Sequence, residues 1–245
     1  GMNAAINSSK WTVLAKATDD KFYKINIVFV NFAINDAVDA ANIAKGLNQA
    51  NWATEFGAGS VVMFNNDVDM SGVEIILGDS GGSGYDASWG FMGTIDGNGK
   101  TISNLSSAWL TYINNACTIK NLTFKNMKSG ATLAYKSAGA KLQNVTFEVD
   151  ANGLTDMYLV SPRQARSALS MTDCTVKITN ASSTFKCYIY HSMSQSYGKG
   201  SLNVTNLKVT MNGGSFAAVT NETTTCDLTG TQTNTVVNGT LDYNV

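Results

Sequence analysis

The chain has few charged residues. Asp, Glu, Lys and Arg together make up 14% of its 245 residues, against roughly 25% in an average globular protein. The 17 basic and 18 acidic residues leave a formal net charge of -1. A protein that neutralises a phosphate backbone needs an excess of Lys and Arg on one face. This composition therefore argues against a nucleic-acid partner.

Long apolar runs are missing as well. The longest run, INIVFVNFAI at residues 25–34, is much shorter than the roughly 20 residues that a membrane-spanning helix needs. We therefore expect no transmembrane segment. Residues 1–11 lack the basic start and apolar stretch of a secretion signal, so any such signal is expected outside this chain.

Cysteine and histidine are too scarce and too scattered for a zinc site. The cysteines Cys117, Cys174, Cys187 and Cys226 form no CxxC pair, and the chain has only 1 histidine. Buried free cysteines are common in protein cores. We therefore expect 4 buried free thiols and no cofactor.

Uncharged polar residues take the place of the missing charges. The chain contains 26 asparagines and 22 glycines, which favour tight turns and disfavour helices. The 44% of hydrophobic residues supply ample material for a core. Together these features predict strands joined by polar turns.

A short unit recurs through the last two thirds of the chain. It reads TISNLS, TIKNLTF, KLQNVTF, SMTDCTV, NVTNLKV and TVVNGTL, with apolar residues that alternate around a central Asn or Asp. The central residues are Asn104, Asn121, Asn144, Asp173, Asn206 and Asn238, spaced 17, 23, 29, 33 and 32 residues apart. Alternation is the period of strands. Each unit is therefore predicted to be two short strands that meet at a polar corner.

Corner residues that recur at one place in successive coils predict a parallel stack. Asparagine suits such a ladder because it tolerates left-handed geometry and can hydrogen-bond the backbone and the next amide. Solenoid coils can also differ in length without disturbing their strands. DGNGKTISN at residues 96–104 is interpreted as the turn and the first strand that begin this stack, with Gly97 and Gly99 supplying positive φ. A ligand-binding loop is the weaker interpretation.

The residues that support this interpretation also resemble a known family. VVMFNNDVDMSG at 61–72, FMGTIDGNGKTISNLS at 91–106 and ACTIKNLTF at 116–124 resemble the opening coils of bacterial secreted and cell-surface right-handed β-helix proteins. These have a pectate-lyase-like fold and often carry GLUG-type repeats, although the glycine-rich GLUG phrase is missing here. The resemblance covers about residues 34–126 and implies the fold and an extracellular bacterial setting. It implies no activity, because one fold hosts many functions.

We therefore expect an all-β fold, a single-stranded right-handed parallel β-helix of about seven coils with an N-terminal capping helix. Residues 1–33 are assigned to N-terminal strands that can be the end of an upstream β-domain. Residues 34–60 are assigned to the capping helix and a linker, with Asn35 or Asp36 as N-cap and Val38, Ala41, Ala44 and Leu47 on one face. Residues 61–245 are assigned to the β-helix.

A candidate site follows from alternation in the strands after the longer loops. Alternation places Leu159, Cys187 and Ile189 inside the coil. It leaves an outer patch of Tyr158, Tyr188 and Tyr190 with Asp156, Lys186 and His191. Arg163 and Arg166 lie in the loop that follows Tyr158.

Three interpretations of this patch remain open. It can bind a polysaccharide or a host or cell-surface glycan through tyrosine rings, which predicts an extracellular adhesion or carbohydrate-contact module without catalysis. It can belong to a polysaccharide lyase or glycoside hydrolase acting on acidic polysaccharide, with Arg163, Arg166 and Asp156 as catalytic candidates and calcium only in this case. It can also be ordinary surface.

Overall fold

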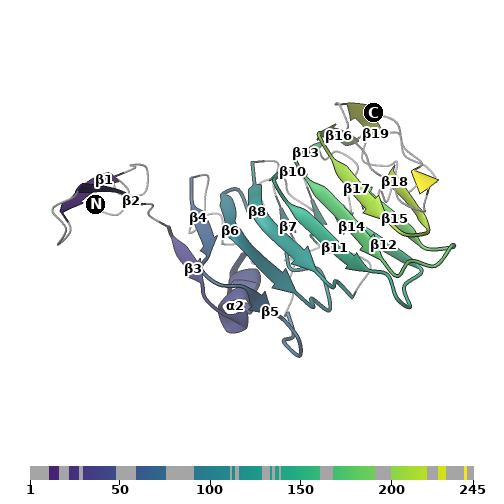
Figure 1. Ribbon diagram of the computed structural model, residues 1–245, viewed down its shortest axis with the longest axis horizontal. Helices are drawn as coiled ribbons and strands as arrows, with labels where there is room; N and C mark the ends of the chain where they lie inside the picture. Colours follow the sequence, from purple (N-terminus) through teal and green to yellow (C-terminus); the bar gives the residue numbers. More distant parts are fainter. Residues whose placement is uncertain are drawn as a thin grey trace, which may run out of the picture.

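In its described residues, the protein is an all-β parallel β-helix with one α-helix. The computed structural model describes residues 11–16, 22–27, 30–47, 59–75, 91–110, 112–113, 116–128, 133, 136–137, 139–160, 168–190, 200–219, 226–229 and 240–241. Figure 1 shows the coils stacked side by side from the helix toward the C-terminal strands. Every strand pair of the stack is parallel, whereas β1 (Trp11–Lys16) and β2 (Phe22–Ile27) form a separate antiparallel pair.

Three faces make up each full coil. The first face contains β3 (Phe32–Ile34), β4 (Val61–Phe64), the start of β6 (Thr94–Ser103), the start of β8 (Thr118–Lys125), β10 (Gly139–Gln143), β13 (Ala168–Thr172), β16 (Gly200–Thr205) and β19 (Cys226–Thr229). The second face contains β5 (Val68–Asp69), the ends of β6 and β8, β11 (Thr146–Asp150), β14 (Thr175–Thr179) and β17 (Lys208–Met211). The third contains β7 (Tyr112–Ile113), β9 (Lys136–Ser137), β12 (Asp156–Val160), β15 (Lys186–Tyr190), β18 (Ser215–Val219) and β20 (Thr240–Leu241).

The core is built from inward side chains that repeat at one position in successive coils. On the first face, the paired and buried residues are Ile95, Ile119, Leu142, Met171 and Val204. On the second face, Phe124 and Phe147 stack with ring centroids 5.4 Å apart. Burying each such side chain stabilises the fold by roughly 1.5–3 kcal/mol. The alternating pattern read from the sequence is therefore the pattern of the core.

The parallel stack begins earlier in the chain than expected. β3 pairs in parallel with β4, so Phe32 and Ile34 belong to the first coil although residues up to 33 were assigned to a separate N-terminal part. After Ile34 the chain turns into α2 (Ala37–Leu47). The helix contacts β3 and β5, and Figure 1 shows it below β4 at the end of the stack where the first coils lie.

Helix α2 packs on the first coils through a face different from the one predicted. The Asp36 carboxylate accepts a hydrogen bond from Asp39 N at 2.9 Å, which makes Asp36 the N-cap. Ala40, Ile43 and Ala44 are buried, whereas Val38 is 64% exposed. Of the predicted face, Ala44 is buried and Ala41 is half-buried, but Val38 is exposed, so the buried face is rotated by part of a turn from the predicted one. Trp109, fully buried, donates from Nε1 to the Ala40 carbonyl oxygen at 3.0 Å and fixes the helix to the core.

The first corner, between the first and second faces, carries most of the predicted polar ladder. Asn121, Asn144, Asp173 and Asn206 all have φ between 52° and 54° there. Asn144 Nδ2 donates to Asn121 Oδ1 at 3.0 Å, and Asn206 Nδ2 donates to Asp173 Oδ1 at 2.6 Å. The Asn121 amide in turn donates to Asp96 at 3.1 Å. Asn238 lies outside the described residues.

Asn104 does not belong to this ladder. It lies at the second corner, at the end of the second face, where its Nδ2 donates to Asp69 Oδ1 at 2.8 Å. In β6 the first corner is formed instead by residues 96–100, where the register with β8 shifts. Both corners demand a polar residue with positive φ, so the recurring pattern does not distinguish them.

The two glycines of this turn have different roles, which corrects the expectation for Gly97. Gly99 has φ 74° and open space around the position of a Cβ. Gly97 has no positive φ. A Cβ on Gly97 would overlap the Asn121 carbonyl oxygen and lie 2.6 Å from Leu122 Cα. Gly97 is therefore needed because the next coil approaches it closely.

Candidate functional site

The outer patch on the third face lies on strands β12 and β15. Asp156 pairs with Lys186, and Tyr158 pairs with Tyr188. The neighbours Met157, Leu159, Cys187 and Ile189 are buried, so the outward and inward sets alternate as predicted. In the next coil, Ala217 on β18 pairs with Tyr188.

The two tyrosine rings stack on each other and do not lie as a flat strip. Their centroids are 5.6 Å apart and their planes differ by 15°. Parallel rings at this distance form an offset stack, in which each ring covers part of one face of the other. On the other side of Tyr188 the neighbour is Ala217, whose methyl group is too small to cover a ring. In the part of the chain that the structure describes, no second ring stacks on this side of Tyr188, and we term the side of Tyr188 that faces Ala217 the notch.

The phenol of Tyr158 is perturbed by its surroundings. Its partial burial raises the pKa of Tyr158 above its usual value, and the nearby Asp156 carboxylate and Tyr188 raise it further. The hydroxyl therefore stays protonated at neutral pH and can donate a hydrogen bond.

The remaining residues predicted for this patch are not placed. Arg163, Arg166 and His191 lie outside the described residues, and of Tyr190 only the backbone is described, in β15. Asp156 is thus the one residue of the lyase alternative with a described position. Among the described residues, no group of three or more His, Cys, Asp or Glu side chains is arranged to hold a metal ion.

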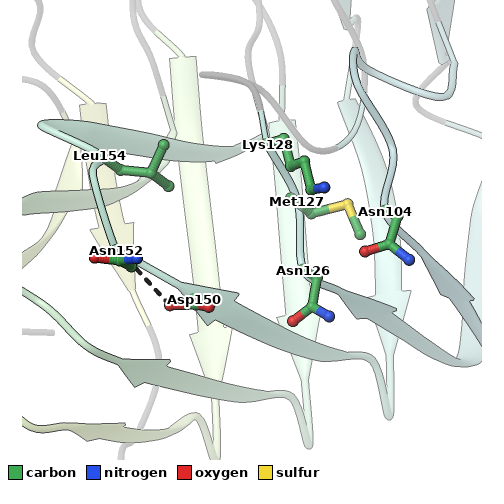
Figure 2. Close-up of a pocket in the computed structure, with 7 residues that line it drawn as sticks. All are labelled: Asn104, Asn126, Met127, Lys128, Asp150, Asn152 and Leu154. Atoms are coloured by element: carbon green, nitrogen blue, oxygen red, sulfur yellow. Dashed lines mark hydrogen bonds between the residues drawn. The ribbon is translucent and has the colours of Figure 1, made fainter. Parts of the chain in front are cut away.

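A second candidate site, missed from the sequence, is a hollow at the second corner that we term the corner pocket (Figure 2). Its volume is about 430 Å³. Its polar lining comes from Asn104, Asn126, Lys128, Asp150 and Asn152, and its apolar lining comes from Met127 and Leu154. Figure 2 shows Lys128, Met127 and Asn126 on one side and Leu154, Asn152 and Asp150 on the other.

The corner pocket results from a step between two neighbouring coils. The backbone N–H of Asn126, directly after β8, donates to the Glu148 carbonyl oxygen at 3.0 Å, so β8 ends opposite the middle of β11. β11 continues to Asp150 before it turns. The extra length, at roughly 3.3 Å per residue, forms one wall of the pocket. The rise in repeat spacing from 23 to 29 residues is the sequence signal of this step.

Hydrogen bonds hold the carboxylates of this corner in place. Asp150 Oδ1 accepts from Asn180 Nδ2 at 3.0 Å and from Asn152 N at 3.1 Å, and these bonds lower the pKa of Asp150. The pKa of Asp69 is lowered mainly by its bonds from Asn104 and Ser71, with a smaller contribution from Lys128. Both side chains are therefore ionised at neutral pH.

A second hollow adjoins the corner pocket along the stack. Its volume is about 420 Å³, and it shares Asn126 with the corner pocket. Its charged lining residues are Asp67, Asp69 and Lys125. The two hollows meet at Asn126 and are lined by residues of successive coils, and we term them together the groove.

Comparisons with known proteins identify no family for this chain. No family model matches it, and no curated protein matches it. One solved structure is similar, described as a "putative immunoglobulin A1 protease" from Bacteroides ovatus. The similarity has a TM-score of 0.40 and 11% identity over 86% of this chain and 83% of the other. Similarity at this level transfers neither fold nor activity.

No helix in the described part of the chain has the length and apolar character needed to cross a bilayer.

Proposed function

We propose that this chain is an extracellular bacterial surface module that contacts a polysaccharide or a host or cell-surface glycan without catalysis. The observation that carries the proposal is the notch beside Tyr188, where the paired residue of the next coil is the small Ala217 and no described ring stacks on Tyr188. The extracellular setting is taken from the resemblance to secreted β-helix proteins.

The chemistry of the notch suits a sugar ring. The C–H face of a pyranose packs on an aromatic face, and the Lys186 and Asp156 side chains on the same strands can hydrogen-bond its hydroxyl groups. The contact area is small, and association entropy offsets part of the gain, so we expect micromolar or poorer affinity. Several copies on one cell surface raise the effective affinity.

A glycan array probed with the full chain tests this proposal. We expect a hit that Tyr188→Ala abolishes, because the variant removes the exposed ring face. Ala217→Leu leaves both rings in place but fills the notch, and it should also abolish the hit. Lys177→Ala, on the second face, is the matched surface control.

The competing lyase function predicts a different result. Incubation with polyuronates would produce unsaturated product and a rise in ultraviolet absorbance, lost in Arg163→Ala with Arg166→Ala. Turnover of this kind would replace the binding proposal. Binding that survives both Tyr188→Ala and Ala217→Leu would show that the notch is ordinary surface.

A further inference from the structure

We infer that the corner pocket and the adjoining hollow bind a neutral oligosaccharide, with Asn126 between two successive sugar units. This site lies at the second corner, on residues separate from the tyrosine notch, and it does not depend on the function proposed for that notch. Its basis is the combination of available polar groups, balanced charge and an apolar side chain within one hollow.

The polar side chains of the corner pocket are held in place, but some of their donor and acceptor atoms make no hydrogen bond within the described residues. The side-chain amide of Asn126 makes no hydrogen bond to any described residue, and so offers both a donor and an acceptor. Asp150 uses Oδ1 for both of its hydrogen bonds, which leaves Oδ2 as an acceptor. Asn104 uses Nδ2 for Asp69, which leaves its amide oxygen. A sugar hydroxyl donates and accepts, and so matches this mixture.

The charge of the groove selects against acidic ligands. In the corner pocket, Lys128 balances Asp150. In the adjoining hollow, Asp67 and Asp69 outnumber Lys125, and the Lys125 ammonium already lies 3.8 Å from Glu148. A uronate carboxylate would meet net negative charge there, whereas a neutral hydroxyl group would not.

The size of the pocket and its partly exposed Leu154 side chain suit a sugar ring. The two hollows have volumes of about 430 and 420 Å³, which lie in the lower part of the range of volumes of ligand-binding pockets. Half-buried Leu154 and the buried Met127 line opposite sides of the corner pocket. The Leu154 side chain can contact the C–H groups of a pyranose, while the polar residues on both sides bind its hydroxyls.

The test uses ligand-observed saturation-transfer NMR on the full chain with short gluco-, manno-, galacto- and xylo-oligosaccharides, and with oligogalacturonate as the acidic probe. Asn126→Gly removes the amide yet keeps the backbone, because Asn126 has φ 52° and glycine adopts that conformation without strain. Lys128→Ala is the second variant. Lys177→Ala is the control, because Lys177 lies on the second face, is ion-paired with Glu148 and does not line either hollow.

We expect at least one neutral oligosaccharide to bind, with Asn126→Gly and Lys128→Ala each weakening it about tenfold, the loss of roughly one hydrogen bond. Lys177→Ala should bind like the parent, and oligogalacturonate should bind more weakly. Absence of binding across the neutral panel would overturn the inference. Tighter binding of oligogalacturonate would also overturn it, as would binding that only Tyr188→Ala abolishes, which would assign the ligand to the notch.

Discussion

Gly97 and Gly99 are one residue apart, yet glycine is required for a different reason at each. At Gly99 the backbone has positive φ and there is room for a side chain. At Gly97 the backbone is ordinary, and the neighbouring coil at Asn121 and Leu122 leaves no room. The sequence alone identifies both as turn glycines. How closely two coils approach each other depends on how they stack, and this cannot be read from the turn itself.

This difference predicts unequal effects of alanine. Gly97→Ala should lower the free energy of unfolding by roughly 1–3 kcal/mol, because the methyl group overlaps backbone that cannot move away. Gly99→Ala should cost about 1 kcal/mol, the strain of an alanine at positive φ. Urea unfolding measures both. Equal losses would contradict the close approach at Gly97.

The buried cysteines give a second prediction at this scale. Cys117 and Cys187 are fully buried, and burial raises the pKa of both thiols; it raises the pKa of Cys174 to about 11. All three are free, whereas the Cys226 side chain lies outside the described residues. These three thiols should therefore not react with a thiol reagent in the native protein near pH 8. In denaturant we expect 4 reactive thiols, and a count of zero would contradict the prediction.

At the scale of strands and corners, alternation in the sequence was sufficient to predict which side chains point outward. Tyr158 and Tyr188 lie outside on paired positions, and the residues between them lie inside. Their mutual stacking was not predictable, because alternation defines the direction of a Cβ but not the plane of the ring attached to it. The prediction for Asn104 was wrong for a related reason. The local sequence shows that this residue needs positive φ, but it does not show at which of the two corners the residue lies.

The ladder at the first corner predicts graded effects at Asn144. Asn144→Leu removes the hydrogen bond to Asn121 and places a branched side chain at φ 52°, so it should cost on the order of 1–3 kcal/mol. Asn144→Gly removes the same bond but accepts the backbone conformation, and should cost less than Asn144→Leu. Thermal melts of the two variants measure the difference. A melt of Asn144→Leu unchanged within error would rule out a stabilising ladder.

At the scale of the whole molecule, the recurring unit predicted the parallel β-helix because every coil buries the same alternating set. The corner pocket was not predictable in the same way. It exists because β8 ends earlier than its neighbour β11, and two coils must be stacked before a difference in their lengths becomes a hollow. The repeat spacing showed that the coils lengthen, but it did not show at which corner the added residues lie.

The first coil ends the stack on one side, and α2 covers it there. Ile43 is buried against the core, only 3% exposed, on the same side of the helix as Ala40. Without the helix, the apolar interior around Phe64 and Trp109 would be open to water and to other copies of the chain. The helix should therefore limit self-association as well as stabilise the first coils.

Ile43→Asp tests this role, because a carboxylate at a buried position favours release of the helix. We expect Trp109 to become exposed, with a red shift of tryptophan fluorescence, and larger species in light scattering, while the far-ultraviolet circular dichroism of the strands persists. Val38→Asp, at a 64% exposed position of the same helix, is the matched control and should behave like the parent. A monodisperse Ile43→Asp protein with native fluorescence would show that α2 is not needed to cover the stack.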